Sequence, residues 1–183
     1  MSQPLNFQPT LQGSLVKLEP LTQAHTELLA QCAANLSTWA DYPVDAVKKT
    51  GNLSAWFTGG IECAQAIAIF DVETGNMIGT TRYYTVPGDP DGVGIGYTFI
   101  HADYRRSGQT NAELKSLMFA HAFEQVSTIW FHVLPDNLRS QAAVKKLGVV
   151  EHGVQELHLT DQPRPYVTFS ISKESWAKLR SQT

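Results

Sequence analysis

Tyr104-Arg105-Arg106-Ser107-Gly108-Gln109-Thr110-Asn111 joins a strand predicted over residues 93–100 to the clearest helix of the chain, predicted over residues 111–125. That helix has an apolar stripe with i, i+3, i+4, i+7 and i+8 spacing, made by Leu114, Leu117, Met118, His121 and Ala122. A further strand is predicted at residues 129–133. A strand, a helix and a second strand in this order imply a right-handed parallel crossover.

The eight-residue segment has features of a phosphate-binding loop. The start of a helix presents unpaired main-chain N–H groups and a partial positive charge, and both favour a bound anion. Gly108 lets the main chain approach a bound group closely, and Arg105 and Arg106 add positive charge beside it. A second interpretation stays open, because Thr110 and Glu113 also fit a capping box that would only start the helix and leave the arginines solvated.

The flanking sequence predicts a mixed α/β sheet covered by helices. Strands are expected at residues 15–20, 66–71, 77–84, 151–159 and 166–171, and helices at residues 24–34, 137–147 and 173–180. Pro20 is expected to end the first strand, the segment from Glu73 to Asn76 to form a hairpin turn, and residues 87–92 to form a loop. We expect residues 1–10 to form an arm and residues 11–183 a single domain.

Composition narrows the class of protein. Of the 183 residues, 43% are hydrophobic and 17% are charged, which favours a globular domain over a disordered chain. The formal net charge of -3 disfavours bulk binding to nucleic acid. No signal peptide is apparent at the N-terminus, and the longest apolar stretch, residues 64–70, is too short to span a membrane. We therefore expect a cytoplasmic protein with buried free thiols at Cys32 and Cys63 and with neither a nucleic-acid nor a membrane partner.

Several motifs in order resemble those of one family. The relevant blocks are Ile95-Gly96-Tyr97-Thr98-Phe99-Ile100, then Arg105 to Lys115, then Asn137-Leu138-Arg139-Ser140 with Lys146-Leu147-Gly148. They resemble the GNAT superfamily of N-acetyltransferases, in the branch of the ribosomal-protein N-terminal acetyltransferases (RimJ/RimL-like). The likeness extends to the start, at Leu15 to Leu21, and to the end, at Tyr166 to Trp176. It implies a mostly antiparallel central sheet with a parallel, V-shaped split, flanked by helices.

The resemblance also implies a cosubstrate and its contacts. Acetyl-CoA would place its pyrophosphate on the loop, and its pantetheine arm would pair with a strand like an extra strand. The cofactor-binding residues implied are Thr98, Phe99, Ile100, Arg105, Arg106, Ser107, Gly108, Gln109, Thr110, Asn111 and Asn137. Ser140 is the implied catalytic acid for the leaving thiolate, although as the third residue after Asn137 it fits ordinary support of a helix start equally well. In many relatives a tyrosine does this work one turn further on, where this chain has Val144.

The proton acceptor for the attacking amine is not evident in the sequence. Acyl transfer requires a neutral amine, so a base or a water must take its proton. A main-chain N–H near Tyr97 or Thr98 could stabilise the charge on the carbonyl oxygen. Many relatives carry a glutamate two residues before Gly96, but this chain has Gly94 there. The remaining candidates, among which the sequence does not choose, are Asp89, Asp91, His101, Glu156 and His158.

The sequence thus predicts an N-acetyltransferase that moves an acetyl group from acetyl-CoA to a primary amine in a ternary complex. The acceptor is expected to be a small molecule or a protein N-terminus, with residues near Trp39 and Arg82 as candidates for the acceptor wall. An acyl-CoA-binding module without catalysis is the alternative that Gly94 keeps open. No metal is expected, because His132 and His158 lie without metal-ligand spacing. The protein is expected to be a monomer or a homodimer.

Overall fold

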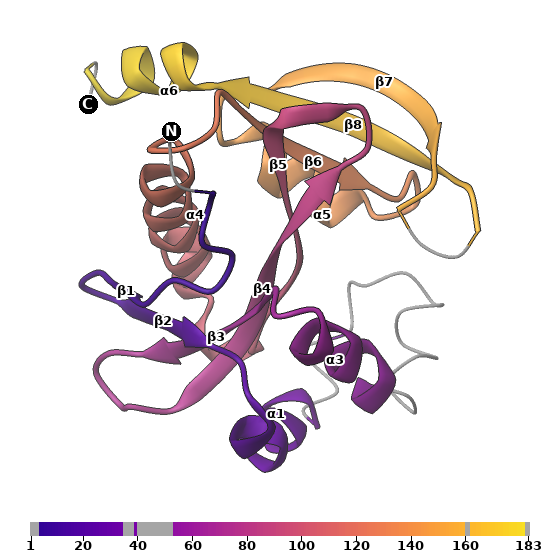
Figure 1. Cartoon of the computed structure of the whole chain (residues 1–183). Helices are drawn as coiled ribbons and strands as arrows, with labels where there is room; N and C mark the ends of the chain where they lie inside the picture. Colours follow the sequence, from indigo (N-terminus) through magenta and orange to yellow (C-terminus); the bar gives the residue numbers. More distant parts are fainter. Residues whose placement is uncertain (1–3, 35–38, 40–52, 160–161, 182–183) are drawn as a thin grey trace. The chain divides into compact units, whose positions relative to one another are not determined.

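The computed structural model describes residues 4–34, 39, 53–159 and 162–181. The chain separates into two compact units (Figure 1), and we describe each by itself. The N-terminal unit holds Asn6–Tyr83 and Tyr97–Met118, and the C-terminal unit holds Tyr84–Gly96 and the chain from Phe119 onward, together with residues 4–5. The expected division into a 1–10 arm and one domain stays a prediction, although Gln8 Nε2 donates a hydrogen bond to the Ala66 carbonyl at 2.8 Å.

The first half of the chain forms most of the strands. In chain order the elements are β1 (Leu11–Gln12), β2 (Val16–Pro20), a 3-10 turn (Gln23–His25), α1 (Thr26–Ala33), α3 (Leu53–Glu62), β3 (Ala66–Asp71), β4 (Met77–Val86) and β5 (Asp89–Ile100). β2 pairs antiparallel with both β1 and β3, and β3 pairs antiparallel with β4. These strands follow one another in space as they do in sequence, as Figure 1 shows.

The second half begins with the segment that opened the sequence argument. Its elements are two 3-10 turns (Ala102–Tyr104 and Arg106–Gly108), α4 (Gln109–Ala122), β6 (Thr128–Val133), α5 (Leu138–Lys145), β7 (Val150–Leu157), β8 (Arg164–Ser172) and α6 (Lys173–Arg180). The strand order is β1-β2-β3-β4-β5-β6-β8-β7. β5 and β6 are parallel, as the predicted crossover requires, and β8 is antiparallel to both β6 and β7. The predicted fold class, a mixed and mostly antiparallel sheet flanked by helices, is confirmed.

Of two predictions near strand ends, one is confirmed and one was wrong. β2 ends at Pro20, which pairs with Ile67, because the last residue of a short strand can do without an N–H donor. Residues 87–92 do not form a loop: Pro87 and Gly88 make a tight turn, and β5 begins at Asp89. Gly88 adopts φ +84°, which lets so short a connection close.

The capping box at the start of α4 is also absent. Thr110 is buried and donates its hydroxyl to the Tyr104 carbonyl, which ties the helix back to the turn before it. Glu113 instead binds the turn between β1 and β2. It accepts hydrogen bonds from the main-chain N–H groups of Ser14 (2.9 Å), Leu15 (2.7 Å) and Val16 (2.8 Å), and from the Ser14 hydroxyl (2.6 Å).

The core of the N-terminal unit joins α1 to the sheet. Leu29 and Cys32 of α1 are buried with Trp39 and Phe99, whose rings lie 5.1 Å apart. Trp39, expected as a candidate for the acceptor wall, is 2% exposed and donates its indole N–H to the Ala33 carbonyl at 2.8 Å. Tyr42 lies outside the described residues.

The C-terminal unit has an aromatic core on one face of its strands. Phe119 and Phe123 of α4 pack against Trp176 of α6, with ring centroids 6.3 and 5.3 Å apart, and Phe119 also contacts Phe131 of β6 at 6.0 Å. Side chains alternate along a strand, so Trp130 and His132 lie on the opposite face of β6 from Phe131. The two faces of the strands therefore differ in character, and the second one is described with the site.

The structure also bears on three predictions, which concern the cysteines, a metal site and membrane-spanning helices. Cys32 is buried, and burial raises the pKa of its thiol to about 12, but Cys63 is exposed just beyond α3, so the prediction of two buried thiols was half wrong. Among the described residues, His, Cys, Asp and Glu side chains do not gather in threes at a distance suited to a metal ion. None of the described helices has the length and apolar character needed to cross a membrane.

Candidate functional site

The loop before α4 contains three consecutive residues in the left-handed region. Arg106, Ser107 and Gly108 have φ values of +44°, +56° and +96°. Glycine adopts such a conformation readily, but arginine and serine do so at a cost in conformational energy. Successive main-chain N–H groups in a turn of this kind point toward a common centre and form a concave anion site. Arg106 and Ser107 thus adopt strained conformations, and these give the loop a main-chain shape that suits a phosphate.

Two side-chain contacts hold this loop in place. The Arg105 Nε–H donates to the Ile100 carbonyl at 3.0 Å, which ties the loop to the end of β5. The guanidinium of Arg106 forms an ion pair with Asp71 at 2.7 Å, and Asp71 in turn accepts hydrogen bonds from the N–H and hydroxyl of Thr74 in the β3–β4 turn. Burial works to raise the pKa of the Asp71 carboxyl, but Arg106 and Thr74 outweigh it and hold that pKa below its usual value.

The Arg106 side chain is therefore directed into the protein and not toward solvent. Asp71 is 1% exposed, so the ion pair with Arg106 neutralises a buried carboxylate. The sequence suggested that both arginines add free charge to the loop. In the structure one of them is engaged by the hairpin turn, and within the loop the Gly108 N–H donates a hydrogen bond to the Arg105 carbonyl at 2.8 Å.

The end of β5 is fixed through the side chain of Thr98. Its hydroxyl lies 2.8 Å from that of Thr81 on β4 and accepts a hydrogen bond from Lys115 Nζ of α4 at 2.9 Å. Tyr97, immediately before it, has φ +51°, so the strand is locally distorted at this residue. Lys115 is 5% exposed, and burial lowers its pKa to about 7.

In the C-terminal unit, Asn137 is the N-cap of α5. Its side-chain oxygen accepts a hydrogen bond from the Ser140 N–H at 3.1 Å, which is the structural role that the sequence left open for this pair. Val144, one turn further on, is buried. The side chains of Asn137 and Ser140 are both half-buried, so they remain accessible to a ligand.

The second face of the C-terminal strands carries a group of rings that sequence reasoning did not assign to the site. We call it the aromatic face and define it as Tyr84, Trp130, His132 and Tyr166. The Tyr84 hydroxyl lies 2.9 Å from His132 Nδ1, and the ring of His132 stacks parallel to that of Trp130 with centroids 6.1 Å apart. Tyr166 lies edge-on to His132 at 6.4 Å.

Gly94 explains how Tyr84 reaches this position. A Cβ atom at residue 94 would lie 2.1 Å from the Tyr84 ring, closer than any real contact, and one at Gly96 would lie 3.1 Å from it. The tyrosine ring thus occupies the space in which a side chain at position 94 would begin. The absence of a glutamate there has a structural cause, because Tyr84 already fills the site.

The other candidate bases have structural roles or lie on the surface. Asp89 accepts a hydrogen bond from Trp130 Nε1 at 2.7 Å, and His101 accepts one from the Asp103 N–H at 3.3 Å at the start of a 3-10 turn. Asp91, Glu156 and His158 are exposed. Nothing in these positions distinguishes one of them as a proton acceptor.

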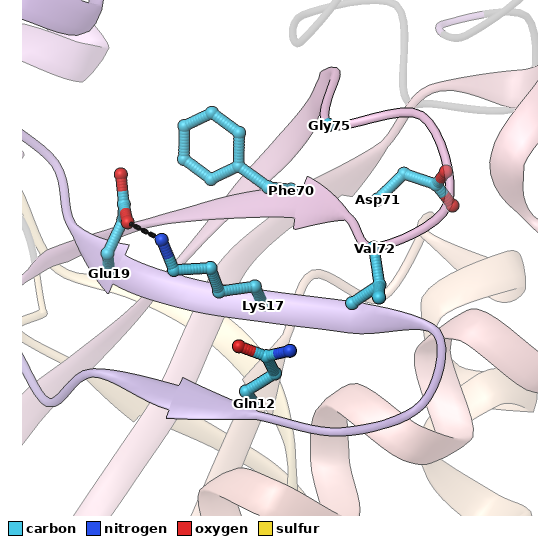
Figure 2. Close-up of a pocket in the computed structure, with 7 residues that line it drawn as sticks. All are labelled: Gln12, Lys17, Glu19, Phe70, Asp71, Val72 and Gly75. Atoms are coloured by element: carbon cyan, nitrogen blue, oxygen red, sulfur yellow. Dashed lines mark ion pairs between the residues drawn. The ribbon is translucent and has the colours of Figure 1, made fainter.

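A pocket of the N-terminal unit lies apart from the predicted site residues. Figure 2 shows its lining, which comes from the β1–β2 hairpin, the end of β3 and the turn that follows. Lys17 and Glu19 form an ion pair across it at 2.7 Å. Of its lining residues, Asp71 is the one that contacts the loop before α4, through Arg106. We therefore do not assign the coenzyme to this hollow.

Comparison with known families identifies this architecture. A family model described as an acetyltransferase (GNAT) domain matches residues 16–150, which include β2 through the start of β7. The chain belongs to the GNAT acetyltransferase family. No curated protein sequence matches this GNAT domain.

Solved structures share the fold of this GNAT domain at low sequence identity. A GCN5-related N-acetyltransferase from Brucella melitensis is 19% identical, with a TM-score of 0.76, over 95% of this chain and 83% of that one. RimJ from Mycobacterium smegmatis, solved with CoA-disulfide, is 16% identical, with a TM-score of 0.62, over 91% and 88%. FdhC, described as a nucleotide-linked sugar GNAT, is 14% identical, with a TM-score of 0.63, over 96% of each chain.

The structure thus groups the predicted residues of this GNAT domain in two sets. Thr98–Ile100 and Arg105–Asn111 lie in the N-terminal unit, where the Arg105–Ile100 hydrogen bond joins them. Asn137 and Ser140 lie in the C-terminal unit, in one helix turn. Sequence reasoning missed Lys115, Tyr84 and His132. The signal for Tyr84 was present in Gly92-Val93-Gly94-Ile95-Gly96, because glycine at every second position of a strand clears one face for a neighbour.

Proposed function

We propose that this GNAT domain is an acetyl-CoA-dependent N-acetyltransferase that acylates a primary amine. The observation that carries the proposal is the run of left-handed residues from Arg106 to Gly108 at the start of α4. Arg106 and Ser107 adopt strained conformations here, and a turn of successive left-handed residues is a shape that can direct main-chain N–H groups at an anion. The diphosphate of coenzyme A is an anion of suitable size, and the helix that follows adds its partial positive charge.

The anchored strand end supports the placement of the rest of the cosubstrate. We assign the pantetheine arm, which carries amide groups, to the main chain of Thr98–Ile100, the segment that the family resemblance implies. The side chain of Thr98 is held by Thr81 and Lys115 on one side, so it does not compete for this role. Arg105 links the two binding segments through its bond to the Ile100 carbonyl.

The acyl transfer requires few groups of the protein. The neutral amine attacks the thioester carbon. A main-chain N–H near Tyr97, where the strand is distorted, stabilises the carbonyl oxygen. The coenzyme then leaves as its thiolate. We assign Ser140 as the donor of a hydrogen bond to that thiolate. Much of the remaining rate enhancement is expected from holding the two substrates in line.

We infer that the acceptor is either a protein N-terminus, as in a RimJ/RimL-like enzyme, or a small amine. RimJ and a sugar-acting GNAT have this fold at nearly equal TM-scores. Fold likeness therefore does not choose between the two acceptor classes.

The test uses the purified protein with acetyl-CoA and a panel of peptides and small amines. Acetyl-CoA is expected to raise the melting temperature, because a ligand of the folded state stabilises it. Release of free coenzyme thiol with an acceptor would then establish transfer. A raised melting temperature with no thiol release on any acceptor would favour the acyl-CoA-binding module instead. No rise in melting temperature would contradict both.

A further inference from the structure

The aromatic face contains a hydrogen-bonded pair that the proposed reaction has not yet used. Tyr84 comes from β4 and His132 from β6, and their Oη and Nδ1 atoms are 2.9 Å apart. Both side chains are half-buried, so they are shielded from bulk water and still accessible to a ligand. The whole pair, with the glycines beneath it, lies within the C-terminal unit.

Two glycines of β5 make room for the ring of this tyrosine. The Tyr84 ring covers Gly94 and Gly96, and Gly96 directly precedes Tyr97, which is followed in sequence by the segment assigned to the pantetheine arm. A Cβ atom at residue 94 would lie 2.1 Å from the ring, so the ring would have to move. The strand thus accommodates a tyrosine at this place.

His132 is neutral and can accept a hydrogen bond. Burial lowers its pKa to about 4, so the imidazole is neutral at physiological pH, and an imidazolium formed there gives up its proton readily. A neutral imidazole with hydrogen on Nε2 accepts a hydrogen bond from the Tyr84 hydroxyl at Nδ1. The arrangement is a base oriented against a hydroxyl, within hydrogen-bond distance.

The other titratable groups that face this pair are occupied or distant from it. Asp89 accepts the hydrogen bond of the Trp130 indole, and the His152 imidazole shares a hydrogen bond of 2.7 Å with the Ser170 hydroxyl. Tyr166 presents its ring edge-on to His132. The described part of this face thus offers Tyr84 and His132 as its proton-accepting pair.

We propose that Tyr84 and His132 accept the proton of the attacking amine, with Tyr84 as the group that contacts the substrate and His132 as the positioning residue behind it. The inference rests on the proposed acyl transfer and deepens it. As the amine nitrogen bonds to the acyl carbon, its N–H proton passes to Tyr84 Oη and the tyrosine proton passes to His132 Nδ1. The carbon–sulfur bond breaks, and the imidazolium returns one proton, through Tyr84, to the leaving thiolate or to water. The products are the amide and the free coenzyme thiol.

Two adjacent tyrosines of β4 make a matched experiment. Tyr84→Phe keeps the ring over Gly94 and removes only the hydroxyl. Tyr83→Phe makes the same change on the opposite face, where the Tyr83 hydroxyl donates to the buried Met118 carbonyl at 2.6 Å. We expect Tyr84→Phe to lower kcat roughly 100-fold with little change in melting temperature. We expect Tyr83→Phe to lower the melting temperature and to leave kcat per folded molecule within about twofold of the parent.

The His132→Asn variant distinguishes proton uptake by His132 from a role in which His132 only supports Tyr84 by a hydrogen bond. The asparagine oxygen can take the place of Nδ1 as a hydrogen-bond acceptor, but it cannot take up a proton at neutral pH. A supporting role would be rescued by asparagine, whereas proton acceptance would be lost and kcat would fall as in Tyr84→Phe. Because the two residues act as a unit, the double variant is expected to be no slower than about 100-fold below the parent, not the product of the single effects.

The outcomes separate this proposal from the proposed function. The rise in melting temperature with acetyl-CoA should persist in Tyr84→Phe and His132→Asn, because neither residue belongs to the assigned coenzyme contacts. If the parent releases thiol and Tyr84→Phe is as fast, or His132→Asn retains full activity, the pair has no part in proton transfer and the acyltransferase assignment stands. If the parent binds acetyl-CoA but releases no thiol with any acceptor, both the transferase function and the role of the pair are wrong.

Discussion

At the scale of single residues, Lys115 shows how one buried charge supports a binding strand. Its ammonium group lies on α4 with Thr98 Oγ1 as a hydrogen-bond partner at 2.9 Å. Thr98 is thereby fixed between two elements, since its hydroxyl also lies 2.8 Å from that of Thr81. The protein bears the cost of desolvating a lysine to hold this strand in place.

The pH dependence of stability should reveal this lysine. Its pKa is about 7 in the folded protein and about 10.4 in the unfolded chain. Between these values the unfolded chain binds the proton and the folded protein does not, so the free energy of unfolding should rise with pH by at most about 1.4 kcal/mol per pH unit. Below pH 7 both states are protonated, and the contribution stays at its minimum.

Lys115→Met should abolish this rise. We expect the variant to gain stability over the parent at pH 6 and to lose that advantage by pH 9, because methionine fills a similar space without a charge to desolvate. Urea unfolding of both proteins at pH 6, 7.5 and 9 measures the difference. A constant difference in unfolding free energy across this range would show that Lys115 titrates normally in the folded state.

Gly108 is a second case in which a single residue matters, because the shape of the loop depends on its φ angle. A Cβ at this position would contact nothing within 4 Å, so a substitution is penalised only by the φ of +96°. Gly108→Ala and Gly108→Asp should therefore destabilise the protein similarly, by about 1–2 kcal/mol. The aspartate alone adds a negative charge where we place the diphosphate.

The affinity for coenzyme A should distinguish these two variants. We expect Gly108→Asp to weaken binding at least about tenfold more than Gly108→Ala, which corresponds to about 1.4 kcal/mol. Isothermal titration with coenzyme A measures both dissociation constants. Equal affinities for the two variants would remove the loop from the binding site.

At the scale of elements, the contact between α4 and the β1–β2 turn is the strongest polar link that the structure describes between a helix and a strand turn. One carboxylate, that of Glu113, accepts four hydrogen bonds from Ser14, Leu15 and Val16. Burial works to raise the pKa of Glu113, but these hydrogen bonds outweigh it and lower that pKa. The charged form is thus favoured in the folded protein.

Replacement of this carboxylate should cost stability above pH 5. Glu113→Gln is expected to lower the free energy of unfolding by about 1–3 kcal/mol at pH 7, because an amide accepts fewer and weaker hydrogen bonds. A lowered folded-state pKa gives stability that is present above the unfolded pKa and lost as pH falls through the folded one. The difference between parent and variant should accordingly shrink at acid pH.

Glu174 provides the matched control for that substitution. It is exposed on α6 and pairs with Lys178 at 2.7 Å, four residues along the helix. Glu174→Gln should leave the free energy of unfolding nearly unchanged, because solvent screens this exposed pair. Thermal unfolding at pH 7 and pH 4 compares the two variants. Equal losses for Glu113→Gln and Glu174→Gln would mean that the α4 contact does not stabilise the fold.

The elements were largely predictable because their signals are local. The apolar stripe of α4, the glycine after α5 and the turn at Glu73–Asn76 each act over a few residues, and the structure has all three features. The errors came from partners distant in sequence. Glu113 bonds to residues almost one hundred positions earlier, so a capping box and a distant clamp look the same in sequence. Residues 87–92 contain turn formers, yet pairing at the start of β5 overrides their preference.

At the scale of the whole molecule, family membership follows from the order of many modest motifs, and the family model confirms it. The candidate site was predictable only in part. The loop from Arg105 to Asn111 could be proposed from the sequence because a helix start has a sequence signature, and its role in binding stays a prediction. Tyr84 and His132 were not found, because they lie 48 positions apart and meet only when β4, β5 and β6 assemble. Patterns in a single sequence do not reveal a contact between two residues so far apart.

The fit of the Tyr84 ring over Gly94 also restricts how this protein can change. Gly94→Glu alone should lose about 1–3 kcal/mol of stability, because its Cβ would lie 2.1 Å from the Tyr84 ring. Tyr84→Ala together with Gly94→Glu should recover part of that loss, and urea unfolding of the single and double variants measures the coupling. If the effects of the two substitutions on the free energy of unfolding are additive, residues 84 and 94 are not coupled. An ancestor or a designer moving between the tyrosine and the carboxylate therefore faces a fixed order of steps, in which the ring must be given up before the acid can be gained.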